Sequence, residues 1–401
     1  MDKATQVRVT GPLAPYASPF RGQLLGLDYS PSSAATHLVL MAQLSRWLDA
    51  TKLLPAELSP ERVQEFLTAN RSQGHRFPKS SRGSELLVNF LRNEGVVPER
   101  GVAVLTETDG LLERFRCYLV SERGLAAGTV GNHVHAARLF LGRLDLNDLD
   151  GLQELRPSRI NEFIVAESRC RSVSSTKCLV TGLRSLLRFF HVEGITPGSL
   201  VGAVPTVSGW AMTWLPRAAD PTSVKRLFAS CDRGTVKGRR DYAILMVLTR
   251  LGLRVGEAAA LKLDDVDWRR GELVVRGKAN RLEPLPLPAD VGQALAAYLK
   301  HARPRSEHRE LFLRVLAPHR GLTGGAVIVV VRSACDRADL APIAAHKLRH
   351  TVASELLRAG AGLPEIGQVL RHRSIASTAI YTKVDTARLR ELARPWPGTT
   401  P

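Results

Sequence analysis

Two short stretches in the last third of the chain hold side chains that could act on a phosphate group. LGLRVGEAAAL (251–261) places Arg254 between two glycines at a helix–helix junction, with Glu257 three residues later. A buried arginine needs a partner, and Glu257 lies one helical turn away. VRGKANR (275–281) sets Lys278 at the expected tip of a hairpin.

Two further stretches add histidines, a second arginine and a tyrosine. HKLRHT begins with His346 and has Arg349 three residues on, so both side chains can point into one cleft. VLRHRSIASTAIYTKVD (369–385) contains His372, followed nine positions later by Tyr381. Two arginines, two histidines, a lysine and a tyrosine together supply what metal-free transfer of a phosphodiester requires.

Each of these residues also has an ordinary structural explanation when it is taken singly. Arg254 could end a helix, and a hairpin tip is where a solvated lysine such as Lys278 is commonly found. His346 could cap a helix, and Tyr381 could pack in a core. It is their joint occurrence in one half of a basic chain that favours the phosphate interpretation.

The charge of the chain is concentrated in the same half. The 401 residues carry a net charge of +18. Residues 1–200 have 24 Lys/Arg against 20 Asp/Glu, whereas residues 201–401 have 32 against 18. Such an asymmetry indicates a polyanion, with nucleic acid the favoured partner. The sequence has neither a lysine tail nor a basic amphipathic helix, the features that would favour a membrane surface as the partner.

Other classes of protein are disfavoured by composition. The five cysteines are scattered without a CxxC pair, so we expect neither a disulfide framework nor a metal site, and no cofactor motif stands out. No apolar run approaches the roughly 20 residues of a membrane span, and the first residues lack a signal pattern. We therefore expect a cytoplasmic protein.

The elements that must position the phosphate-binding residues follow a proline- and glycine-containing passage and occupy 210–401. Helices are predicted over 221–231, 239–252, 289–303, 322–338, 346–360 and 363–371. Two strands, 271–277 and 281–288, flank the polar tetrapeptide GKAN. A few short strands among many helices indicate an α+β domain.

The first half of the chain contains what resembles an internal repeat. ELSPERVQEFLTA (57–69) parallels ELRPSRINEFIVA (154–166), and similar parallels join the helices before and after them at a nearly constant shift. After an irregular arm (1–17), this predicts two helical domains of one type, over 18–100 and 105–200. The alternative is that amphipathic helices simply resemble one another.

The order of the candidate residues resembles that of the tyrosine recombinase (phage integrase) family. The family carries Arg, a hairpin Lys, His-x-x-Arg, His or Trp, and Tyr nine residues later. These positions match GLRVGE, GKANR, HKLRH, LRHRS and IYTKVD, that is, Arg254, Lys278, His346, Arg349, His372 and Tyr381. The likeness covers 221–384, with a looser one over 105–200. Arg371 departs from the LGH triplet that the family commonly has.

The resemblance implies a mainly helical fold with a small β component. One or two SAM-like helical core-binding domains would precede the α+β catalytic domain, whose tail (385–401) would dock on a neighbouring protomer. The implied partner is double-stranded DNA, bound at two sites by a homo-tetramer or together with related recombinases, without a membrane. No metal or other cofactor is implied.

The resemblance also implies a role for each residue. Tyr381 would attack the phosphodiester and form a 3′-phosphotyrosyl bond, with His346 as general base and Lys278 protonating the departing 5′-oxygen. The phosphate would be held by Arg254, Arg349 and His372, with Glu257 fixing the Arg254 fork.

Two other functions stay open at this point. A type IB topoisomerase would use the same chemistry to nick, swivel and reseal a single duplex. A regulatory or accessory DNA-binding protein would keep the fold without the catalysis. A core-binding domain and a docking tail favour strand exchange. The doubled helical region and the basic, arginine-rich composition favour a recombinase of a mobile element.

Overall fold

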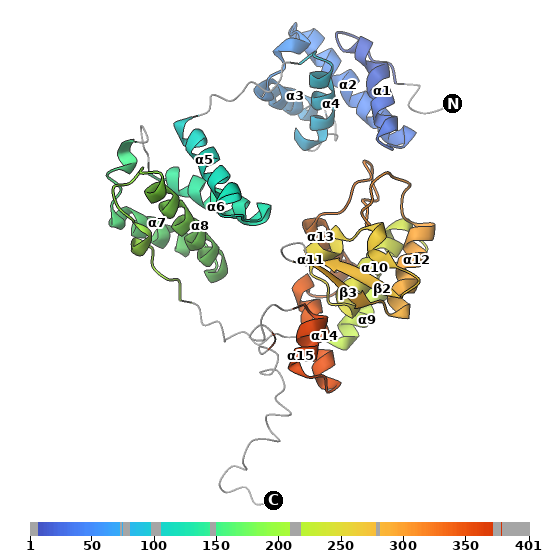
Figure 1. Cartoon of the computed structure of the whole chain (residues 1–401). Coiled ribbons are helices and arrows are strands. Elements are labelled where there is room, and N and C mark those ends of the chain that lie inside the picture. The colour runs from blue at the N-terminus through green and yellow to red at the C-terminus, as the bar shows by residue number, and fades with distance from the viewer. Residues whose placement is uncertain are drawn as a thin grey trace, which may run out of the picture. The chain divides into compact units, whose positions relative to one another are not determined.

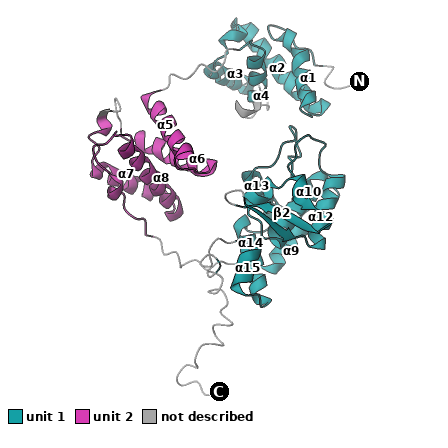
Figure 2. Ribbon diagram, viewed as in Figure 1, with its two compact units in different colours: residues 1–98, 214–401 teal, residues 99–213 magenta. Residues whose placement is uncertain are grey.

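A computed structural model shows a mainly helical protein with one small antiparallel sheet, as the sequence predicted (Figure 1). The structure describes residues 7–72, 74, 81–97, 106–144, 150–208, 218–277, 281–371 and 378. Residues 99–213 form one compact unit, and residues 1–98 with 214–401 form the other (Figure 2). Among the described residues, every helix is too short or too polar to cross a membrane.

The first group of helices has its own apolar core. It consists of α1 (Ala17–Gly26), α2 (Pro31–Thr51), α3 (Pro60–Ser72) and α4 (Ser81–Asn93). Leu38, Leu44 and Leu48 lie along α2 and are buried in one core with side chains such as Phe20 and Phe66. Ser30 caps α2, because its hydroxyl accepts a hydrogen bond from the Ser33 N–H.

The second group repeats this number and order of helices. It consists of α5 (Glu107–Ser121), α6 (Ala127–Leu141), α7 (Pro157–Arg169) and α8 (Val173–Val192) around a core of aromatic and aliphatic side chains. The helices α3 and α7 both begin at a proline and have the same length. Gly95 and Gly194 follow the last helix of each group with left-handed φ values of 70° and 68°. That the two groups are domains of one type stays a prediction.

The last part of the chain carries the predicted α+β elements. Its helices are α9 (Pro221–Ala229), α10 (Val236–Arg250), α11 (Val255–Ala260), α12 (Ala289–His301), α13 (Gly324–Arg337), α14 (Ala345–Arg358) and α15 (Leu363–Val369). The strands β1 (Val266–Asp267), β2 (Glu272–Arg276) and β3 (Leu282–Pro286) pair antiparallel in that order. β2 and β3 lie within a few residues of the predicted strands, whereas the two-residue β1 was not predicted.

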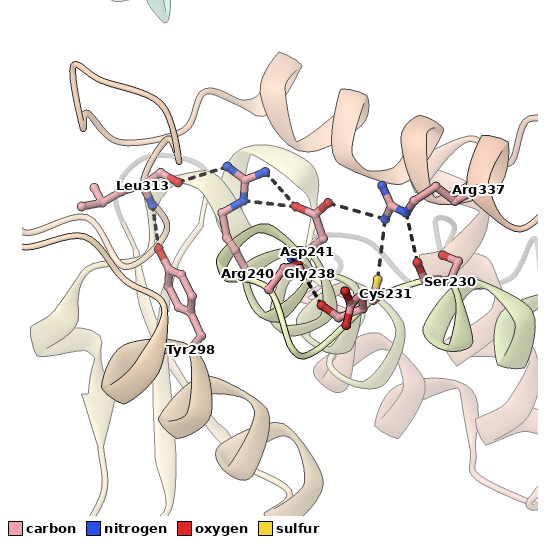
Figure 3. Close-up of polar contacts among 10 residues, drawn as sticks. Ser230, Cys231, Gly238, Arg240, Asp241, Tyr298, Leu313 and Arg337 are labelled. Atoms are coloured by element: carbon pink, nitrogen blue, oxygen red, sulfur yellow. Dashed lines mark hydrogen bonds and ion pairs between the residues drawn. The ribbon is translucent and has the colours of Figure 1, made fainter. Parts of the chain in front are cut away.

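A buried charge cluster fixes α10, the helix that leads to the candidate site (Figure 3). The Asp241 carboxylate accepts a hydrogen bond from Arg240 Nη2 at 2.8 Å and lies 3.5 Å from Arg337 Nη2 of α13. Arg240 also donates to the carbonyl of Leu313 at 3.3 Å, and the Tyr298 hydroxyl accepts from the Leu313 N–H. These contacts join α10 to α13 and to the segment around Leu313, and a buried charge left without them would be costly.

Candidate active site

Arg254 stands at the start of α11, where it is the N-cap residue with an extended backbone. The Glu257 carboxylate accepts two hydrogen bonds from it, one from the backbone N–H at 2.9 Å and one from Nη1 at 2.5 Å. The contact that the one-turn spacing suggested is therefore present. The Arg254 side chain is 44% exposed and that of Glu257 only 7%, so a buried carboxylate supports a half-exposed arginine.

A glycine makes the turn before Arg254 possible. Gly252 has a left-handed φ of 58°. A Cβ atom at this position would lie 2.9 Å from Leu370 Cδ2, closer than such atoms approach in proteins. Gly252 thus allows the end of α10 and the end of α15 to pack directly against each other.

Arg349 joins these same two places from α14. Its residue is 1% exposed. Nη1 donates to the Gly252 carbonyl at 2.5 Å, and Nη2 donates to the Leu370 carbonyl. In this structure the two terminal nitrogens of Arg349 therefore support the scaffold around Arg254.

Three arginine side chains reach carbonyls at the C-terminal end of α15 and in the two residues after it. Arg371 Nη1 donates to the carbonyl of Val369 at 3.0 Å, and Arg349 donates to that of Leu370. Arg254 Nη2 lies 3.5 Å from the carbonyl of Arg371 itself. Carbonyls at a helix C-terminus lack partners within the helix and carry its negative end, so cations gather there favourably. These contacts bring the two predicted arginines to neighbouring points of one helix end.

His346 lies near both predicted arginines. Desolvation lowers its pKa below the ordinary value, and the positive charges of Arg349 and Arg254 lower the pKa further. The imidazole is therefore neutral at pH 7 and able to accept a proton. Its ring packs edge-on against that of His350, with 4.3 Å between ring centroids.

His350 is a neighbour to which the sequence assigned no role. Burial lowers its pKa to about 4, with further contributions from the nearby charges of His346 and Arg349. This histidine stays neutral over the whole physiological range. The pattern HKLRH displays it plainly, but its i+4 position relative to His346 could equally have been ordinary packing.

Arg371 is the residue that sequence reasoning left without an explanation. Its backbone has a left-handed φ of 54°, a conformation in which glycine is most at ease. Its side chain is only 3% exposed, and Nη2 donates to Glu257 Oε2 at 2.8 Å. Burial alone would raise the pKa of Glu257, but the Arg254 N–H and the charges of Arg371 and Arg254 outweigh it and hold that pKa below its usual value.

Three predicted residues, Lys278, His372 and Tyr381, lie outside the described residues, as does the tail 385–401. The chain order places Lys278 between β2 and β3, whose hairpin is closed by a hydrogen bond of 2.8 Å from the Gly277 N–H to the Arg281 carbonyl.

Fold and site together define an α+β protein that presents an arginine supported by a buried carboxylate. The phage integrase family profile matches residues 218–388. An integrase/recombinase of Sinorhizobium fredii, y4rA, is 37% identical over 394 residues, covering 97% of this chain and 95% of the relative. Tyrosine recombinase XerD of Listeria monocytogenes is 30% identical over 288 residues, covering 70% of this chain and 96% of the relative.

Solved structures show the same fold at lower identity. A lambda integrase (75–356) dimer bound to a COC′ core site has a TM-score of 0.54 and 17% identity, covering 73% of this chain and 98% of that one. XerH recombinase bound to palindromic difH has a TM-score of 0.56 and 18% identity, covering 71% and 86%. The chain belongs to the phage integrase family of tyrosine recombinases. The predicted family, fold class and DNA recombinase activity are thereby confirmed.

Proposed function

We propose that this recombinase cleaves and rejoins DNA strands through a covalent bond between Tyr381 and a 3′-phosphate. The Tyr381 oxygen attacks the phosphorus atom, the bond from phosphorus to the 5′-oxygen breaks, and a 5′-hydroxyl leaves. The 5′-hydroxyl of a second strand then attacks the phosphotyrosine and releases the tyrosine. One phosphoester bond replaces another in each step, so no external energy source is required.

The observation that carries this proposal is the half-exposed Arg254 side chain, which is paired with the buried carboxylate of Glu257. A guanidinium can donate two parallel hydrogen bonds to the non-bridging oxygens of a phosphate, which lysine cannot. The hydrogen bond to Glu257 restricts the rotation of the Arg254 side chain. The exposed part of the Arg254 side chain leaves donors accessible to a ligand. Such prearranged donors stabilise the charge that develops in the transition state.

Arg349 and His372 are the proposed further phosphate ligands. In this structure Arg349 Nη1 donates to the Gly252 carbonyl and Nη2 donates to the Leu370 carbonyl. Because Arg349 is buried here, we propose that phosphate contact by this residue accompanies DNA binding and a local rearrangement. The hydrogen bonds that Arg349 makes in this structure support a second role, in which it holds the backbone around Arg254 in place.

Protons would be handled by His346 and Lys278. The Tyr381 hydroxyl ionises near pH 10 when free, so it needs an acceptor at the moment of attack. Neutral His346 is suited to this because its lowered pKa keeps it unprotonated at pH 7. Lys278 would give its proton to the departing 5′-oxygen.

For partners, we propose double-stranded DNA and a homo-tetramer that joins two DNA sites, alone or with related recombinases. Support comes from the net charge of +18 and from lambda integrase, which shares the fold and has been solved as a tetramer on a Holliday junction. Helical domain 105–200 and catalytic domain 210–401 would close around the duplex, and tail 385–401 would dock on the next protomer. Helical domain 18–100 would extend the DNA footprint or contact a neighbouring protomer. The enzyme would act at the nucleoid in the cytoplasm, on a mobile element.

Selection of the DNA site tests the proposal. The full-length protein is incubated with a pool of duplexes that carry a randomised segment and a nick near its centre, and covalent adducts are recovered and sequenced. We expect enrichment of two inverted half-sites, because symmetric protomers require a symmetric target. Adducts without sequence enrichment would indicate a topoisomerase-like enzyme, and DNA binding without any adduct would indicate a non-catalytic protein.

A further inference from the structure

We propose that Arg371 is a positioning residue that leaves the Arg254 guanidinium its positive charge for the phosphate. The inference rests on the proposed function of Arg254 as a phosphate ligand. Arg371 is the residue at which the sequence departs from the LGH triplet that the resemblance implies. The structure gives this departure a physical explanation in the contacts of Glu257.

The conformation of Arg371 shows that its side chain is held in place against a cost. A left-handed backbone is unfavourable for a residue with a Cβ atom, and a buried guanidinium has lost its hydration. Arg371 has both features, with a φ of 54° and a side chain that is 3% exposed. Contacts with Glu257 Oε2 at 2.8 Å and the Val369 carbonyl at 3.0 Å offset this cost.

A count of charges shows what the pairing with Glu257 achieves. Arg254 and Glu257 alone form an ion pair with no net charge, which would attract a phosphate poorly. The Glu257 carboxylate, however, uses Oε1 for Arg254 Nη1 and Oε2 for Arg371 Nη2. The three residues therefore carry a net charge of +1. Because the Arg371 side chain is buried and the Arg254 side chain is 44% exposed, the accessible part of this charge lies on Arg254.

Arg371 also connects Arg254 and Glu257 to the C-terminal end of α15. Its backbone carbonyl lies 3.5 Å from Arg254 Nη2, while its side chain bonds to the carboxylate that supports Arg254. Contacts from both ends of a single residue thus fix the position of α11 relative to the C-terminus of α15. In the sequence, His372 follows directly.

The test measures the binding of inorganic phosphate to full-length variants without DNA. Phosphate is added at constant ionic strength, and affinity is obtained from the rise in the thermal midpoint of unfolding. Arg371→Gly suits the left-handed backbone and should fold. It should bind phosphate on the order of tenfold more weakly, the effect of losing one charge-assisted interaction. Arg371→Lys keeps the charge but not the forked guanidinium. Its phosphate affinity should lie between those of the wild type and Arg371→Gly.

A second substitution separates charge from structure. Glu257→Gln in the Arg371→Gly background removes the negative charge that Arg371 balanced, so most of the lost phosphate affinity should return. A purely structural role for Arg371 would not give this recovery. The control is Arg250→Ala, which removes an exposed arginine paired with Asp290 and should leave phosphate affinity unchanged.

The proposal is overturned if Arg371→Gly binds phosphate as the wild type does, or if Glu257→Gln restores nothing. Absence of phosphate binding by the wild type would also overturn it. None of these results decides whether covalent DNA adducts form, so failure of the proposed function would be seen separately in the adduct selection.

Discussion

Replacing Arg349 by alanine should loosen two segments that lie far from it in the sequence. The side chain donates to the Gly252 carbonyl, before α11, and to the Leu370 carbonyl, at the end of α15. A hydrogen bond from a charged donor contributes about 1.5–3 kcal/mol to stability, so the loss of two should cost about 3–6 kcal/mol. Because Arg349 is 1% exposed, solvent replaces neither bond in the folded state.

Hydrogen exchange followed by mass spectrometry measures this loss locally. This suits a chain with several cores, because exchange reports the local stability of each segment separately. Amide protection in peptides covering 251–261 and 363–371 should fall about 10²- to 10⁴-fold, since each 1.4 kcal/mol corresponds to a factor of ten. Amides of the first helical group should be unaffected.

The matched control is Arg358→Ala, which removes an exposed arginine from the same helix. It should leave both segments protected. The reasoning is refuted if Arg349→Ala changes protection no more than Arg358→Ala does, or if the loss is confined to α14 itself.

Three further outcomes follow from the site. Gly252→Ala should destabilise the catalytic part by at least about 1–2 kcal/mol, because it combines a left-handed φ with a close contact to Leu370; an unchanged thermal midpoint would contradict this. Arg254→Lys should slow single-turnover adduct formation about a hundredfold or more while changing stability by less than about 1 kcal/mol, since the side chain is half exposed; adduct kinetics with a melting curve checks both. The pKa of His350, about 4 in the folded state against an ordinary 6.5, means that the unfolded chain takes up this proton first, so stability should be lost as pH falls from 6.5 to 4. His350→Asn should reduce the loss of stability between pH 6.5 and 4. It should not alter how stability depends on pH above 6.5, and melting curves recorded across this range check both.

Contacts within one helical turn could be predicted from the sequence. Arg254 and Glu257 are three residues apart at a helix start, and this local geometry holds wherever the helix lies in the fold. The strands β2 and β3 were similarly indicated by the tight, polar tetrapeptide between them.

Contacts between residues far apart in the sequence could not be predicted in this way. Arg349 meets the Gly252 carbonyl across 97 positions, and Arg371 meets Glu257 across 114. Nothing in the local pattern indicates that an arginine will bond to backbone carbonyls instead of a phosphate. Arg371 was recognised as a departure from a common glycine, but its left-handed backbone and its buried partner appear only once α11 and α15 are packed together.

The central claim is that Tyr381 is the nucleophile, and mapping the covalent bond tests it most directly. The wild type and Tyr381→Phe are incubated with the nicked duplex obtained by selection, and the protein–DNA adduct is digested and analysed by mass spectrometry. We predict a nucleotide bound through a 3′-phosphate to the peptide containing Tyr381, and no adduct with Tyr381→Phe despite undiminished DNA binding. An adduct on another residue, or one that persists in Tyr381→Phe, would contradict the account.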